Sequence, residues 1–131
     1  MLRGFRRPRL WIAMWLVMFV GVIVLSLMPG PPIPAELVIG KLDHGIAYFC
    51  LVAMAVQIFP SWRQWFSAAL LAALLGVSLE VAQGVLTDYR HMSAYDAIID
   101  CFGAALGLAT GWTPLRHALL TIDRWLPAPR R

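Results

Sequence analysis

Residues 10–28 read LWIAMWLVMFVGVIVLSLM, a run of 19 residues without a charged side chain. A helix rises about 1.5 Å per residue, so a run of this length reaches nearly across the roughly 30 Å hydrocarbon core of a bilayer. Pro29 and Pro31 follow, and proline cannot continue a helix. The run therefore predicts a transmembrane helix that ends near Met28.

A cleaved secretory signal peptide is the alternative interpretation of this run, because four arginines precede it. The apolar run is longer than the roughly 7–15 residues usual for such peptides, and no A-x-A cleavage site follows it. We therefore expect the segment to be kept as a membrane span.

The whole chain shares this apolar character. Of its 131 residues, 60% are hydrophobic and only 14% are charged, and the mean hydropathy is +0.72. Soluble domains average about half apolar and a quarter charged residues. So few charges would leave large apolar patches facing water. The composition thus excludes an ordinary soluble domain.

Three further apolar stretches predict spans at about residues 44–59, 66–86 and 95–112. The second is short for a span, and the fourth carries acidic residues. Segments rich in turn-forming residues separate them, at Pro60–Arg63 and at Thr87–His91. We predict an all-α integral membrane bundle of four transmembrane helices, forming a single domain over residues 1–131.

The basic residues indicate the orientation of this bundle. Nine of the eleven belong to the two termini and the 60–63 link, whereas only Lys41 and Arg90 belong to the other side. The positive-inside rule therefore predicts cytoplasmic termini with short basic tails, and outer loops at residues 29–43 and 87–94. Because the basic clusters flank apolar stretches, the net charge of +4 indicates membrane lipids as partners and no nucleic acid.

The acidic residues gather on the predicted outer side. Glu80 lies about six residues before the end of the third span, roughly 9 Å deep, where a charged residue usually faces the bundle interior. Three spans each carry a polar pair on one helix face: His44 with Tyr48, Glu80 with Gln83, and Asp96 with Asp100. Asp43, Asp88 and His91 are expected to be solvated, and either Ser93 or Asp96 to cap the fourth span.

Gly103, Gly107 and Gly111 are spaced by four residues in the fourth span. Small residues at this spacing let two helices approach closely. The stripe predicts tight helix packing, and a homo-oligomer through the same glycines is a further prediction.

Four short motifs occur in order along the chain. They are Ser26-Leu27-Met28-Pro29; Lys41-Leu42-Asp43-His44 followed by Tyr48; Glu80-Val81-Ala82-Gln83 followed by Arg90; and Asp96-Ala97-Ile98-Ile99-Asp100 with Gly103 and Gly107. Together they resemble the VanZ-like family of small membrane proteins, whose patterns are S-L-x-P, D-K-x-x-H-x-x-x-Y, E-x-x-Q…R and D-x-x-x-N-x-x-G-x-x-x-G. Gly40 stands where that family usually has aspartate, and Asp100 where it usually has asparagine.

The resemblance implies a multi-pass protein of the bacterial cytoplasmic (inner) membrane, in a family named after a member associated with teicoplanin resistance. We expect it to bind or move a lipid-linked envelope or wall-precursor substrate at the outer leaflet. One alternative is an intramembrane enzyme, with Glu80, His44 and Asp96 as catalytic candidates. The other is a structural subunit of an envelope complex. The candidate substrate-binding residues are Lys41, Tyr48, Gln83, Arg90 and Asp100.

No sequence motif indicates a haem, flavin or nucleotide, so no cofactor is predicted. His44, Glu80, Asp96 and Asp100 are ligand types that suit a divalent cation. Their spacing matches no metal-binding motif, and neither do Cys50 and Cys101, so no metal site is predicted.

Overall fold

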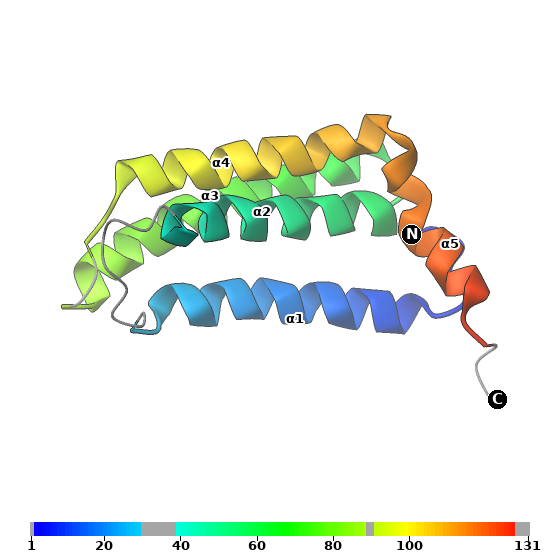
Figure 1. The fold of residues 1–131 in the computed structure, drawn as a ribbon, viewed down its shortest axis with the longest axis horizontal. Helices are drawn as coiled ribbons and strands as arrows, with labels where there is room; N and C mark the ends of the chain where they lie inside the picture. The colour runs from blue at the N-terminus through cyan, green and yellow to red at the C-terminus, as the bar shows by residue number, and fades with distance from the viewer. Residues whose placement is uncertain (1, 30–38, 89–90, 128–131) are drawn as a thin grey trace.

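The computed structural model describes residues 2–29, 39–88 and 91–127, and in these residues its regular elements are all helical. The elements are α1 (Pro8–Leu27), α2 (Ile39–Ile58), α3 (Trp62–Leu86), α4 (Ala94–Ala109) and α5 (Ala118–Trp125), with 3-10 turns η1 (Thr110–Trp112) and η2 (Pro114–His117) between the last two. The all-α prediction is confirmed. In Figure 1, α2, α3 and α4 form one group, and α1 runs alongside it.

The segments predicted as spans overlap α1, α2, α3 and α4 with η1, and two of these helices begin several residues before the predicted segments. Helix α2 begins at Ile39, so the last residues of the predicted 29–43 loop belong to its first turns. Helix α3 begins at Trp62, inside the predicted 60–63 link. Ser61 starts α3 with a capping box: its hydroxyl accepts from the Gln64 N–H, and the Gln64 side chain accepts from the Ser61 N–H.

Among the described residues, two helices, α1 and α3, are long and apolar enough to cross a membrane. The segments Ala94–Trp112 and Pro114–Trp125 meet at a 78° bend and would add a third crossing if counted as one span. The outward faces carry large exposed apolar side chains, among them Val17, Leu25 and Val85 at 70% exposure or more. Such a surface suits a lipid environment better than water.

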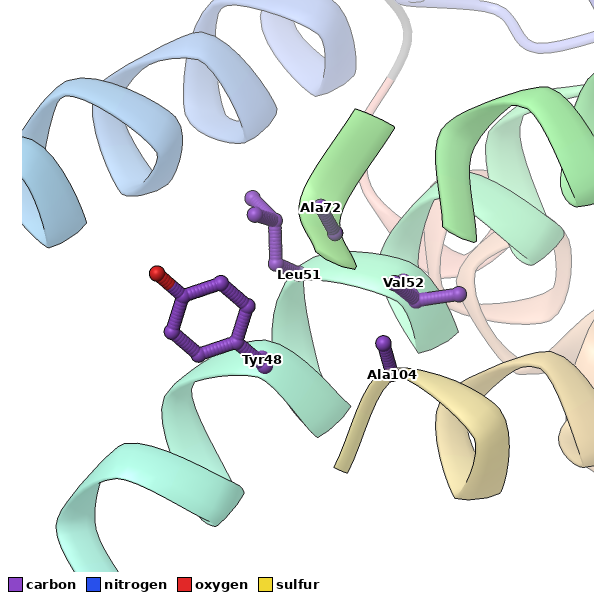
Figure 2. Packing of buried hydrophobic residues seen from close by; sticks show 5 residues of the cluster. All are labelled: Tyr48, Leu51, Val52, Ala72 and Ala104. Atoms are coloured by element: carbon purple, nitrogen blue, oxygen red, sulfur yellow. The ribbon is translucent and has the colours of Figure 1, made fainter. Parts of the chain in front are cut away.

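Helix α2 lies at the centre of the packing. Every residue from Leu51 to Val56 is buried. Figure 2 shows one core cluster, in which side chains of α2 meet single alanines of α3 and α4. Its members are Tyr48, Leu51, Val52, Ala72 and Ala104. Helix α1 is joined to α2 by the Trp15 indole, which donates to the Leu51 carbonyl at 2.9 Å.

The glycine stripe of α4 and η1 packs tightly, as predicted. A Cβ at Gly103 would overlap the carbonyl oxygen of Gly45, and one at Gly107 would lie 2.6 Å from the carbonyl oxygen of Phe49. A Cβ at Gly111 would lie 2.7 Å from the Trp65 ring. All these contacts are made within one chain. Homo-oligomerisation stays a prediction.

At the end of the bundle that carries α5, hydrogen bonds hold residues that the sequence predicted to lie in basic tails. Asp123 is 1% exposed and accepts hydrogen bonds from the Trp11 indole at 2.9 Å and from the Arg6 backbone N–H. Arg3 donates to the carbonyls of Phe59 and Val56 and so caps the end of α2.

The tryptophans divide into two groups. Tryptophan is enriched at membrane interfaces, and five tryptophans lie near the ends of the predicted spans: Trp11, Trp15, Trp62, Trp65 and Trp112. The structure exposes Trp62 and Trp112, whereas Trp11 and Trp65 are only 5% and 6% exposed. Both buried indoles donate hydrogen bonds, Trp11 to Asp123 and Trp65 to the Phe59 carbonyl at 2.7 Å. These two indoles therefore also hold the bundle together, and their interfacial location stays a prediction.

Candidate functional site

Three of the predicted site residues meet at the end of the bundle away from α5. His44 comes from α2, Glu80 from α3 and Asp100 from α4, and one nitrogen or oxygen atom of each lies within 4.8 Å of the others. Glu80 is 3% exposed and Asp100 is 1% exposed, while His44 is partly buried. The polar faces of three helices thus converge on one buried point.

Asp100 is held at this point by the close approach of the helices. Its carboxylate lies over Gly76 of α3, where a Cβ would come within 2.9 Å of Oδ2. Its Oδ1 lies 3.3 Å from His44 Nδ1. Yet Oδ1 is buried and accepts a hydrogen bond from no described residue. The carboxylate therefore has one ionic neighbour and unused acceptor capacity.

Glu80 is oriented by the start of α4. The backbone N–H of Ser93 donates to Glu80 Oε2 at 2.8 Å. Ser93 also caps α4, because its hydroxyl accepts from the Asp96 N–H at 3.2 Å. Of the two predicted caps, Ser93 is therefore the one used. Asp96 lies in the first turn of α4, and its Oδ1 is buried without a described hydrogen-bond partner.

Gln83 and Tyr48 are buried beside this cluster, each at 3% exposure or less. The Gln83 side chain donates to the Ser26 carbonyl at 2.8 Å and ties α3 to the end of α1. Tyr48 belongs to the apolar cluster of Figure 2, with its hydroxyl directed away from the other four labelled residues. Both contribute to packing around the site, and their predicted contact with a substrate is not tested.

The two predicted basic binding residues fall outside this description. Lys41 lies in the first turns of α2, but its side chain is not among the described ones. Arg90 lies wholly outside the described residues. Asp43, Asp88 and His91 are exposed, as expected for solvated residues.

The cluster is rich in hydrogen-bond acceptors and negative charge. Within residues 2–29, 39–88 and 91–127, the one contact of ion-pair type is between His44 and Asp100, and it is an ion pair when the imidazole is protonated. Buried carboxylates are costly unless they are paired, protonated or bound to a cation. The arrangement can therefore bind a cation or a group with several N–H or O–H donors, and it can pass a proton between imidazole and carboxylate.

Two contributors to the site were missed by the sequence reasoning. Gly76 lies one turn before Glu80 and makes room for Asp100, and its small size at that spacing was a visible signal. The backbone N–H of Ser93 was not predictable, because it depends on how the start of α4 meets α3.

Comparisons with known protein families, curated proteins and solved structures gave no match in any of the three. The resemblance to VanZ-like proteins thus rests on the four motifs alone.

Proposed function

We propose that this chain is a VanZ-like protein of the bacterial cytoplasmic membrane that binds or moves a lipid-linked envelope substrate at the outer leaflet. The observation that supports this most is the buried meeting of His44, Glu80 and Asp100 at the end of the bundle away from α5. Ionisable residues buried inside a membrane bundle are costly and usually functional.

In this proposal the chain crosses the membrane four times and both termini are cytoplasmic. The segment before α1, the start of α3 and helix α5 lie at one end of the bundle (Figure 1). That end carries Arg3, Arg6, Arg7, Arg63, Arg116 and Arg124. The positive-inside rule assigns it to the cytoplasm, which puts the acidic cluster in the outer leaflet.

The chemistry of the cluster favours a headgroup rich in donors. Carboxylate oxygens and a neutral imidazole nitrogen accept hydrogen bonds from hydroxyl, amide and ammonium groups. The sugar and peptide portions of a lipid-linked wall precursor offer many such groups. Hydrogen bonds to a carboxylate in a dry site are worth about 1.5–3 kcal/mol each, so a few would hold such a headgroup.

Native mass spectrometry in mild detergent tests this proposal. Wild type, Glu80→Gln and Asp88→Asn are each incubated with a polyprenyl-diphosphate-linked disaccharide-peptide. Asp88 is the matched control, because it is an exposed acid close to the same end of α3. We expect retained, unaltered lipid on wild type and Asp88→Asn, and loss of retention in Glu80→Gln. Absence of lipid from wild type would refute the proposal and favour a structural subunit.

An intramembrane enzyme is the second candidate, favoured by the 3.3 Å approach of His44 Nδ1 to Asp100 Oδ1 with Glu80 close by. An imidazole beside carboxylates is suited to general acid–base chemistry. The same spectra distinguish it from binding. An enzyme would change the mass of the precursor, and Glu80→Gln or His44→Gln would abolish that change.

A further inference from the structure

We propose that His44, Glu80 and Asp100 bind one divalent cation of the Zn²⁺ or Mn²⁺ type. This inference does not rest on the proposed function: a bound cation would occupy the carboxylate oxygens that the headgroup proposal assigns to hydrogen bonds, so the two are tested separately. It also departs from the spacing of the motifs, which predicts no metal site. The residues are separated by 36 and 20 positions in the sequence, and only the packing of three helices brings them together.

The geometry is close to that of a coordination sphere. Two ligands about 2.1 Å from a tetrahedral zinc ion lie about 3.4 Å apart. His44 Nδ1 and Asp100 Oδ1 are 3.3 Å apart, which matches this spacing without any movement. The ligand atoms of all three residues lie within 4.8 Å of one another, so Glu80 has to move toward the other two to complete the sphere. One imidazole with two carboxylates suits Zn²⁺ or Mn²⁺ better than Ca²⁺ or Mg²⁺.

The negative charge of the two carboxylates favours binding of a cation. Glu80 and Asp100 are 3% and 1% exposed, and two ionised carboxylates at that depth repel each other in a medium of low dielectric constant. A dication would neutralise both. In the described part of the chain no lysine or arginine side chain forms an ion pair with either carboxylate.

The buried Oδ1 of Asp100, which lies 3.3 Å from His44 Nδ1, has acceptor capacity left for a ligand. It accepts no hydrogen bond from a described residue, although it faces His44 and the cluster. Buried polar atoms are almost always satisfied, so this acceptor is available to a cation bound in the cluster.

A supporting shell is also present. The Ser93 N–H fixes one oxygen of Glu80, as outer-shell donors commonly do for metal-binding carboxylates. The absence of a side chain at Gly76 lets the Asp100 carboxylate lie deep between α3 and α4. Both features orient the carboxylates before any ion binds.

The test uses Mn²⁺ as the probe, followed by electron paramagnetic resonance. The full chain is purified in detergent, stripped with EDTA and titrated with Mn²⁺, and Zn²⁺ is added as a competitor. The variants are Asp100→Asn and His44→Gln, with Asp88→Asn as the control. We expect saturation at about one Mn²⁺ per chain, displacement by Zn²⁺, and at least about tenfold weaker binding in Asp100→Asn. Asp88→Asn should bind like wild type.

Spin-echo spectra of the wild type keep the test decisive even if a variant fails to fold. A Mn²⁺ ion bound by His44 shows modulation from a directly coordinated ¹⁴N nucleus, and His44→Gln removes it. Wild-type protein that binds no Mn²⁺, or binds it without nitrogen coupling, overturns the proposal. Equal binding by wild type and a folded Asp100→Asn also overturns it. Repeating the lipid incubation on EDTA-stripped protein shows separately whether headgroup binding occurs.

Discussion

Gly103 of α4 lies against the backbone of Gly45 of α2, so closely that a Cβ at position 103 would overlap the Gly45 carbonyl oxygen. Gly45 directly follows His44, and Gly103 lies one turn after Asp100. The same close approach that joins the two helices therefore sets the 3.3 Å distance between the His44 and Asp100 side chains. This contact thus contributes both to helix packing and to the geometry of the site.

We expect Gly103→Ala to destabilise the fold by about 3 kcal/mol, because backbone has to move to admit the methyl group. Gly21→Ala is the matched control, since no atom lies within 4 Å of a Cβ there. That substitution should be neutral, or stabilising by up to about 1 kcal/mol from helix propensity. Thermal unfolding in detergent measures both. Equal melting temperatures for the two variants would show that the close approach of α2 and α4 does not exist.

The helices were predictable because each is marked by a long apolar run with proline or polar residues at its ends. The apolar run of α1 and the proline-rich segment after it needed no tertiary information. Helix starts were less predictable. The first turns of α2 carry Lys41 and Asp43, and such charged residues are typical of a loop outside the membrane. The start of α3 depends on the capping box at Ser61.

The candidate site was predictable residue by residue but not as an arrangement. Helical spacing placed Glu80 and Asp100 on inward faces, yet which residues touch depends on the crossing of α2, α3 and α4. The role of Asp123 was missed for the same reason: its partner Trp11 is 112 positions away in the sequence. No local pattern marks such a pair.

Asp123 should make stability depend on pH. Burial alone raises the pKa of its carboxyl, but hydrogen bonds from the Trp11 indole and from the backbone N–H groups of Arg6 and Arg7 outweigh burial and hold the pKa below its usual range. The stabilisation is thus present above the unfolded-state value of about 3.9 and is lost as the pH falls through the folded pKa.

We therefore expect Asp123→Asn to lower stability by about 2 kcal/mol at neutral pH. The difference in melting temperature from wild type should stay constant from about pH 8 to about pH 5 and narrow below about pH 4. A scan of melting temperature against pH for both proteins measures this. A gap that widens in acid would contradict the assigned direction of the pKa shift.

The proposed topology is tested by labelling introduced cysteines. In a background with Cys50→Ala and Cys101→Ala, His91→Cys and Thr121→Cys place single thiols at exposed positions near opposite ends of the bundle. A membrane-impermeant maleimide applied to intact spheroplasts should label position 91 and not position 121. After permeabilisation both should react. Labelling of position 121 in intact spheroplasts would place the C-terminal end outside.

The claim that His44, Glu80 and Asp100 form a headgroup-binding site is tested most directly by a titration. The polyprenyl-diphosphate-linked disaccharide-peptide is titrated against wild type, Glu80→Gln and Asp88→Asn in lipid nanodiscs, with circular dichroism to verify folding. We predict saturable binding to wild type and Asp88→Asn. Binding to Glu80→Gln should be at least about tenfold weaker, because one charge-assisted hydrogen bond is lost. Equal affinity for all three proteins, or no binding by wild type, would contradict the account.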